Sequence, residues 1–127
     1  MGSEMCIRDS FKSISSEKMP SFYRGIHILF NPTLHKGVPS VTLEAMSCGR
    51  PIIMYKIGNK HIPDNGDIGF FINQDKQQLI SILSELSENP EHLKKLGLQA
   101  SSYIQEKCSV KVITNQIKKI FDNLINN

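Results

Sequence analysis

Residues 35–51 read HKGVPSVTLEAMSCGRP, and this stretch decides the fold of the 127-residue chain. It lies between two short apolar runs, IHILF at residues 26–30 and PIIMY at residues 51–55. Both runs are rich in β-branched residues, as expected of buried parallel strands. Between them the pattern predicts a loop and then a helix over residues 40–47, ended by a glycine. A strand, a helix and a strand in this order form a right-handed parallel crossover.

The rest of the chain adds one strand and three helices to this unit. Residues 69–72, GFFI, follow a loop rich in turn residues and predict a third strand. Asp75, Asn89 and Ser109 are suited to cap three successive helices. The last helix carries an apolar stripe that we assign to the core, consisting of Val110, Ile113, Ile117, Phe121 and Leu124. The predicted class is α/β, a partial Rossmann-like parallel sheet followed by C-terminal helices.

Composition and charge restrict the classes of function. With 39% hydrophobic and 21% charged residues, the chain is typical of one globular domain. Lys and Arg number 15 against 12 Asp and Glu, and they are scattered, which argues against nucleic acid as a partner. No run approaches the roughly 18 apolar residues of a membrane span, so we expect a cytoplasmic protein.

Cysteines and histidines give no sign of a metal centre or a disulfide framework. The three cysteines, Cys6, Cys48 and Cys108, are odd in number and lack CxxC spacing, which predicts reduced thiols. The four histidines are spread along the chain without the spacing of ligands. We therefore expect neither a metal nor another cofactor.

The first ten residues, MGSEMCIRDS, have no hydrophobic period. The segment MCIRD resembles a translation of the transposase mosaic end used in sequencing libraries, ATG TGT ATA AGA GAC, and the preceding residues match the adjoining adapter. We therefore expect residues 1–10 to be a disordered, adapter-derived artefact. Residues 11–127 are then expected to be an incomplete C-terminal domain of a longer protein.

The loop and helix within residues 35–51 predict an anion site. Gly37 lets backbone approach a ligand closely, and a helix that begins near Ser40 presents unpaired N–H groups and its positive dipole end. The site would lie at the carboxyl end of a parallel strand, where phosphates bind in open α/β sheets.

Glu44 is the side chain of this helix with the clearest chemical role. At about 100° per residue the helix has one apolar stripe. That stripe consists of Val41, Ala45 and Cys48. Glu44 lies at its edge, where a partly buried carboxylate needs a partner. A pair of sugar hydroxyls would satisfy it, because a carboxylate accepts two hydrogen bonds side by side. Solvent, Arg50 and Lys56 are the alternative partners.

A family resemblance rests on this segment. The residues in register are Gly37, Pro39, Glu44, Ala45, Met46, Cys48, Gly49 and Pro51. With them the stretch resembles the C-terminal signature of GT-B glycosyltransferases of the glycosyltransferase 4 family, also called glycosyl transferases group 1. The resemblance implies the C-terminal, nucleotide-sugar-binding half of a GT-B fold. It also implies a metal-independent, retaining hexosyltransferase that moves a sugar from a nucleotide sugar to a saccharide or lipid acceptor, in the cytoplasm or at the inner face of the membrane.

The resemblance also implies roles for individual residues. Glu44 would bind the ribose hydroxyls, and the helix start would face the sugar and diphosphate. The positions that would bind the nucleotide sugar are Gly37, Val38, Ser40, Val41 and Glu44. One position departs from the family, because Lys36 stands where the first glutamate contacts the donor hexose. A lysine cannot accept hydroxyl protons, so it would meet the diphosphate, a charged sugar or solvent.

Three other functions compete with donor binding by a transferase. The family's basic pair and acceptor domain lie upstream, so this chain alone is expected to be inactive. Lys36 favours a non-catalytic, GT-B-derived binding or scaffold module. A nucleotide-sugar epimerase of the same architecture fits the Glu44 pattern less well, and an unrelated flavodoxin-like binding domain is the remaining alternative.

Overall fold

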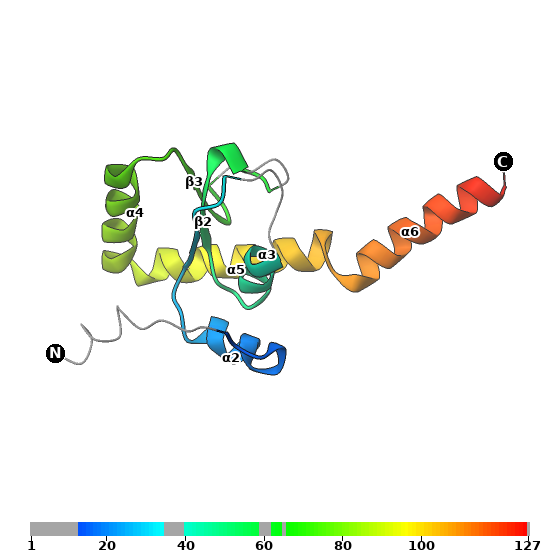
Figure 1. Ribbon diagram of the computed structural model, residues 1–127, viewed down its shortest axis with the longest axis horizontal. Coiled ribbons are helices and arrows are strands. Elements are labelled where there is room, and N and C mark those ends of the chain that lie inside the picture. The colour runs from blue at the N-terminus through cyan, green and yellow to red at the C-terminus, as the bar shows by residue number, and fades with distance from the viewer. Residues whose placement is uncertain (1–12, 35–39, 59–61, 65, 127) are drawn as a thin grey trace.

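The computed structural model describes residues 13–34, 40–58, 62–64 and 66–126. Within these ranges a parallel sheet has the order β1-β2-β3, formed by Leu29–Asn31, Ile52–Tyr55 and Gly69–Ile72. The helical elements are η1 (Ser16–Lys18), α2 (Met19–Arg24), α3 (Ser40–Ser47), η2 (Lys56–Gly58), α4 (Lys76–Glu88), α5 (Pro90–Lys107) and α6 (Val110–Ile125). Figure 1 shows α3 and α5 beside the sheet and α2 below them. The predicted α/β class and the β1–α3–β2 crossover are confirmed.

The first strand is shorter than the sequence predicts, because it begins at Leu29 and not at residue 26. The backbone just before it completes the end of α2. Gly25 N–H donates to the Ser21 carbonyl oxygen at 3.2 Å, and Ile26 N–H donates to that of Tyr23 at 3.3 Å. The strand is half-buried, since β1 forms an edge of the described sheet.

All three predicted helix caps are confirmed. Asp75 Oδ1 accepts from Gln77 N–H at 2.9 Å at the start of α4. The Asn89 side chain accepts from the N–H of His92, and the Ser109 side chain accepts from that of Val112. These bonds satisfy amides that the helices themselves leave without a partner.

The core lies where α3 and α5 cover one face of the sheet. Its buried cluster consists of Met46, Ile52, Met54, Ile62, Ile68, Phe71, Ala100 and Ile104. α3 ends at Ser47 and is followed by Gly49, whose φ of 76° suits glycine, and the Arg50 N–H donates to the Ala45 carbonyl oxygen at 3.0 Å. A Cβ at Gly97 of α5 would overlap the Gly49 carbonyl oxygen, so the two backbones are packed directly on each other.

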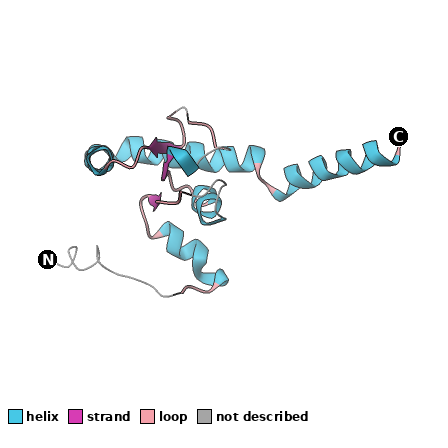
Figure 2. Cartoon of the chain, turned by 45° about the horizontal axis from the view of Figure 1, so that its top comes forward, coloured by secondary structure: helices cyan, strands magenta, loops and turns pink. Residues whose placement is uncertain are grey.

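The last helix corrects one prediction. The sequence predicts that the apolar stripe of α6 lies in the core, but its five residues are exposed, from 43% at Ile113 to 83% at Val110. α6 follows a break at the end of α5 and runs away from the body of the molecule, as both ribbon views show (Figures 1 and 2). Amphipathic spacing gives the direction of the apolar face but not whether a partner covers it.

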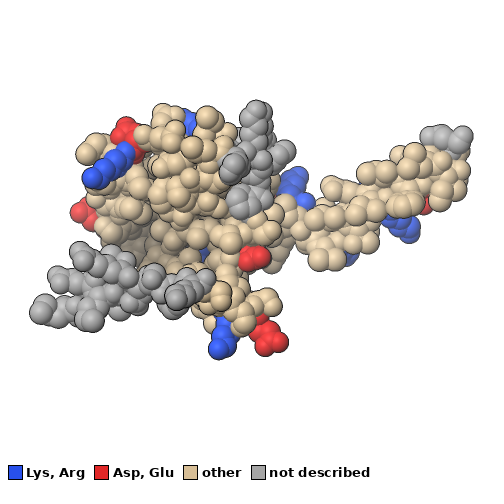
Figure 3. Space-filling model, viewed as in Figure 1, with Lys and Arg blue, Asp and Glu red and all other residues tan. Residues whose placement is uncertain are grey.

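The surface carries mixed charge. Figure 3 shows Lys and Arg interspersed with Asp and Glu on the viewed face, in agreement with the scattered pattern of the sequence. Among the described helices, none has both the length and the apolar character that a membrane span needs.

Candidate functional site

Glu44 forms a side-chain pair with Tyr23, which lies 21 residues earlier in the sequence. The Tyr23 hydroxyl donates to Glu44 Oε2 at 2.8 Å. Tyr23 is on α2 and is only 1% exposed, whereas Glu44 is on the second turn of α3 and is exposed. The carboxylate is thus held at one oxygen while it stays open to solvent. The expectation of a partly buried glutamate is wrong, because α3 turns this position outward.

The phenol of this pair stays protonated over the usual pH range. Burial raises the pKa of Tyr23 to about 12, and the hydrogen bond and negative charge of Glu44 add to the effect. The pKa in the folded chain lies above the ordinary value of about 10. The contribution of the protonated phenol to the stability of the folded chain is therefore fully present below pH 10 and is lost as the pH rises towards 12. Near neutral pH the Tyr23 hydroxyl is therefore a neutral donor to Glu44.

A hollow of about 230 Å³ opens beside this pair between α2 and α3. It is lined by Ser16, Met19, Pro20, Tyr23, Glu44, Ser47 and Cys48. The lining combines apolar surface with a carboxylate and hydroxyl groups, a combination that is common in small-molecule sites.

Arg50 is one of the alternative partners that the sequence offers for Glu44, but its side chain bonds elsewhere. Its Nε donates to the Tyr23 carbonyl oxygen at 2.9 Å, and its Nη2 donates to that of Arg24 at 2.8 Å. The guanidinium therefore caps the C-terminal end of α2, where the helix dipole also favours a cation. α2 is joined to the region of α3 by this cap and by the Tyr23–Glu44 bond.

The buried face of α3 differs from the predicted stripe. Thr42, Ala45 and Met46 are buried, while Val41 is 41% exposed and Cys48 is half-buried. Asn31 Nδ2, at the end of β1, donates to Thr42 Oγ1 at 3.4 Å. This contact connects the carboxyl end of the strand to the first turn of α3, which is the placement that the anion-site prediction requires.

Three of the predicted binding residues are in the described part of the chain. Ser40 is the exposed first residue of α3, Val41 follows it, and Glu44 lies one turn further along the helix. The other predicted positions, Lys36, Gly37 and Val38, lie outside the described residues, as do residues 1–10. Sequence reasoning missed Tyr23 as the partner of Glu44.

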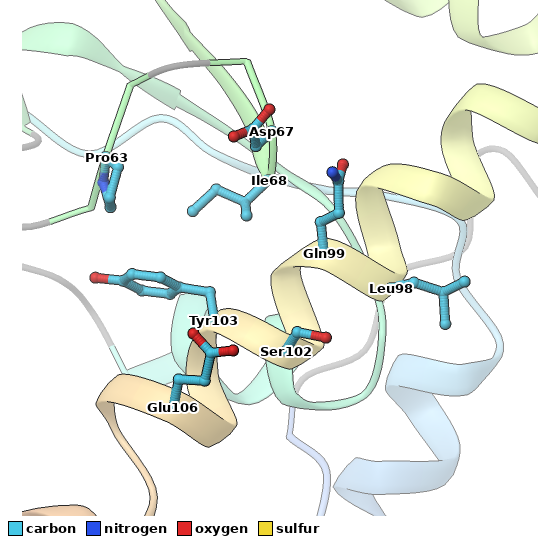
Figure 4. Close-up of a pocket in the computed structure, with 8 residues that line it drawn as sticks. All are labelled: Pro63, Asp67, Ile68, Leu98, Gln99, Ser102, Tyr103 and Glu106. Carbon is cyan, nitrogen blue, oxygen red and sulfur yellow. The ribbon is translucent and has the colours of Figure 1, made fainter.

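A second hollow, of about 330 Å³, lies between α5 and the segment before β3 (Figure 4). It is lined by Pro63, Asp67, Ile68, Leu98, Gln99, Ser102, Tyr103 and Glu106, none of which is a predicted site residue. In the described ranges, no three His, Cys, Asp or Glu side chains gather as metal ligands would. The Glu44 hollow is therefore the candidate site.

Comparison with known proteins identifies the class of protein. Residues 10–89 match the family model described as glycosyl transferases group 1. This match covers more than half of the chain, and the chain belongs to that family. The three-stranded parallel sheet with its helices matches the C-terminal domains of GT-B glycosyltransferases. A search of curated proteins found no significant match.

Three solved structures illustrate the likeness in fold. Sucrose-phosphate synthase from Thermosynechococcus elongatus is 22% identical, with a TM-score of 0.79 over 91% of this chain and 30% of its own. The C-terminal domain of a glycosyl transferase group 1 family protein from Francisella tularensis is 21% identical, with a TM-score of 0.69 over 80% of this chain and 53% of its own. HepE from Anabaena, solved in complex with UDP, is 20% identical, with a TM-score of 0.77 over 94% of this chain and 34% of its own. The chain spans between about a third and a half of these proteins.

Proposed function

We propose that this chain binds the nucleotide-sugar donor of a glycosyltransferase, with Glu44 accepting hydrogen bonds from the ribose hydroxyls. The observation that carries the proposal is the geometry of Glu44, an exposed carboxylate held at one oxygen and lining a hollow beside α3. A carboxylate with free lone pairs suits a pair of vicinal hydroxyls. Family membership and the UDP complex of HepE support a nucleotide as the ligand.

We also propose the remaining parts of the reaction, which the family resemblance implies. The start of α3 and the backbone around Gly37, Val38 and Ser40 would face the sugar and diphosphate, because unpaired N–H groups and the helix dipole favour an anion there. Stabilising the departing nucleoside diphosphate is then the catalytic contribution, in a metal-independent and retaining transfer of a hexose to a saccharide or lipid acceptor. We place the reaction in the cytoplasm or at the inner face of the membrane.

We further propose that residues 11–127 act within a longer enzyme and that the chain alone transfers no sugar. The chain spans 30% to 53% of the similar structures. Sequencing long reads across the 5′ end of the gene tests this arrangement. We expect the MGSEMCIRDS segment to be replaced by an upstream coding region; a gene that begins with this segment would contradict it.

A binding panel tests the proposed function. The folded chain is titrated by calorimetry with UDP, GDP and ADP, and with the 2′-deoxy form of each. We expect one base to bind best, and its 2′-deoxy form to bind about 10-fold or more weakly because a hydrogen bond to a charged group is lost. Absence of saturable binding, or equal affinity for ribo and deoxy forms, would overturn the proposal.

Lys36 favours the non-catalytic binding module as a second candidate, because the family's hexose-binding glutamate is absent at this position. The Lys36→Glu variant restores a hydroxyl acceptor. If the lysine impairs hexose recognition, the variant should gain about 10-fold in affinity for UDP-glucose relative to UDP. The competition between the two ligands is measured by calorimetry. A fall in UDP affinity itself would instead assign Lys36 to the diphosphate and favour the transferase.

A further inference from the structure

We propose that Tyr23 is a positioning residue for Glu44, whose phenol fixes the carboxylate in the orientation that receives the ribose hydroxyls. The proposal rests on the proposed function, since it assumes that Glu44 binds the ribose. It adds a residue from a separate helix to the binding machinery. This residue does not need to touch the ligand.

The first argument concerns the freedom of the carboxylate. The terminal torsion of a glutamate is broad and nearly two-fold, so an exposed carboxylate rotates readily. Here the 2.8 Å bond from the Tyr23 hydroxyl restrains it at Oε2. An ionised carboxylate has about four lone-pair sites, so one bond leaves Oε1 and part of Oε2 for a ligand. Because the carboxylate is already ordered before binding, less side-chain entropy is lost when the ligand binds.

The second argument concerns the rigidity of the phenol. Tyr23 is 1% exposed, and its ring meets that of Phe22 edge to face, with centroids 5.7 Å apart. Arg50 holds the backbone carbonyl oxygens of Tyr23 and Arg24. The tyrosine is therefore fixed at both its backbone and its ring, so it can hold the exposed side chain of Glu44 in place.

The third argument concerns the surroundings of the pair. Tyr23 and Glu44 both line the hollow of about 230 Å³. A bond that only attached α2 to α3 would work equally well away from any cavity. Because the pKa of Tyr23 is raised to about 12, its hydroxyl keeps its proton and stays a donor to Glu44 around neutral pH.

The Tyr23→Phe variant tests the proposal, because it removes the hydroxyl and keeps the buried ring. We expect affinity for the ribonucleotide to fall about 2- to 13-fold, the range for releasing one ordered side chain. The 2′-deoxy form should change less, so the ribo-to-deoxy affinity ratio falls. The probes are UDP, GDP and ADP with their deoxy forms. In a Glu44→Gln background the same change should leave the ratio unaffected, which a double-mutant cycle measures.

The Arg50→Lys variant is the matched control. A lysine lacks the planar fork that serves two carbonyl oxygens, so α2 is loosened while the Tyr23–Glu44 bond is kept. We expect its ribo-to-deoxy ratio to fall less than that of Tyr23→Phe, because the phenol can still donate to Glu44. An equal fall in the ratio for Arg50→Lys would mean that the bond merely docks α2, and the proposal would be overturned.

The outcomes separate this proposal from the proposed function. If the unmodified chain prefers the ribonucleotide, Glu44→Gln removes the preference and Tyr23→Phe preserves it, then only the role of Tyr23 is wrong. If the unmodified chain shows no preference, the ribose assignment of Glu44 fails first. Thermal unfolding of each variant verifies that the compared proteins are folded.

Discussion

Replacing Gly97 by alanine is expected to lower the free energy of unfolding by about 2 kcal/mol. The new Cβ would overlap the carbonyl oxygen of Gly49 and lie 3.1 Å from its carbonyl carbon. Overpacking costs about 1–3 kcal/mol, and a backbone obstacle places this change at the upper end. Alanine recovers about 1 kcal/mol through its higher helix propensity. At roughly 4 °C per kcal/mol, Tm should fall by about 8 °C.

The Ser102→Ala variant is the control for this experiment. Ser102 is exposed on the same helix, so the change adds the propensity of alanine without a steric conflict. It should alter stability by no more than about 0.5 kcal/mol. If thermal melts gave Gly97→Ala the same stability as Ser102→Ala, the direct packing of α5 on the end of α3 would be wrong.

Replacing Glu44 by alanine is expected to weaken binding of the preferred nucleoside diphosphate about 10- to 150-fold. This range corresponds to about 1.5–3 kcal/mol for hydrogen bonds to a charged group. The same substitution leaves the Tyr23 hydroxyl, in a side chain that is 1% exposed, without its acceptor. Stability should therefore fall by about 1–3 kcal/mol as well.

The Glu44→Gln variant separates these two effects. Its amide oxygen still accepts from Tyr23, so Tm should stay near that of the unmodified chain. The variant has no negative charge, and one acceptor oxygen has become a donor, so nucleotide affinity should fall almost as far as in Glu44→Ala. Calorimetric titrations that found full affinity in folded Glu44→Gln would exclude Glu44 as the ribose ligand.

Local signals in the sequence predicted most of the fold. The strands at Ile52–Tyr55 and Gly69–Ile72 were placed correctly because each is a short apolar run between turn residues. The caps Asp75, Asn89 and Ser109 were placed correctly because a cap bonds to amides only two or three residues away. Both kinds of signal depend on neighbours in the chain.

Apart from the late start of β1, the errors concern distant contacts. α3 has apolar residues on two adjoining arcs, and its packing against the sheet and α5 decides that Thr42 is buried and Val41 is not. The exposed stripe of α6 depends on what meets the helix, which periodicity does not encode. Tyr23 bonds to a residue 21 positions away, and no spacing rule connects α2 with α3. The position of Glu44 could be predicted, but its restraint could not.

The attachment of α2 through Tyr23 and Arg50 has a thermodynamic consequence for binding. Local opening of α2 would break the bond to Glu44 and release the carboxylate, so the docked and undocked forms would differ in nucleotide affinity. Linkage is reciprocal. If docking of α2 strengthens nucleotide binding by a given free energy, the bound nucleotide stabilises the docking of α2 by the same free energy. A bound nucleotide would then slow hydrogen exchange at the backbone amides of α2, although the carboxylate that binds it lies on α3.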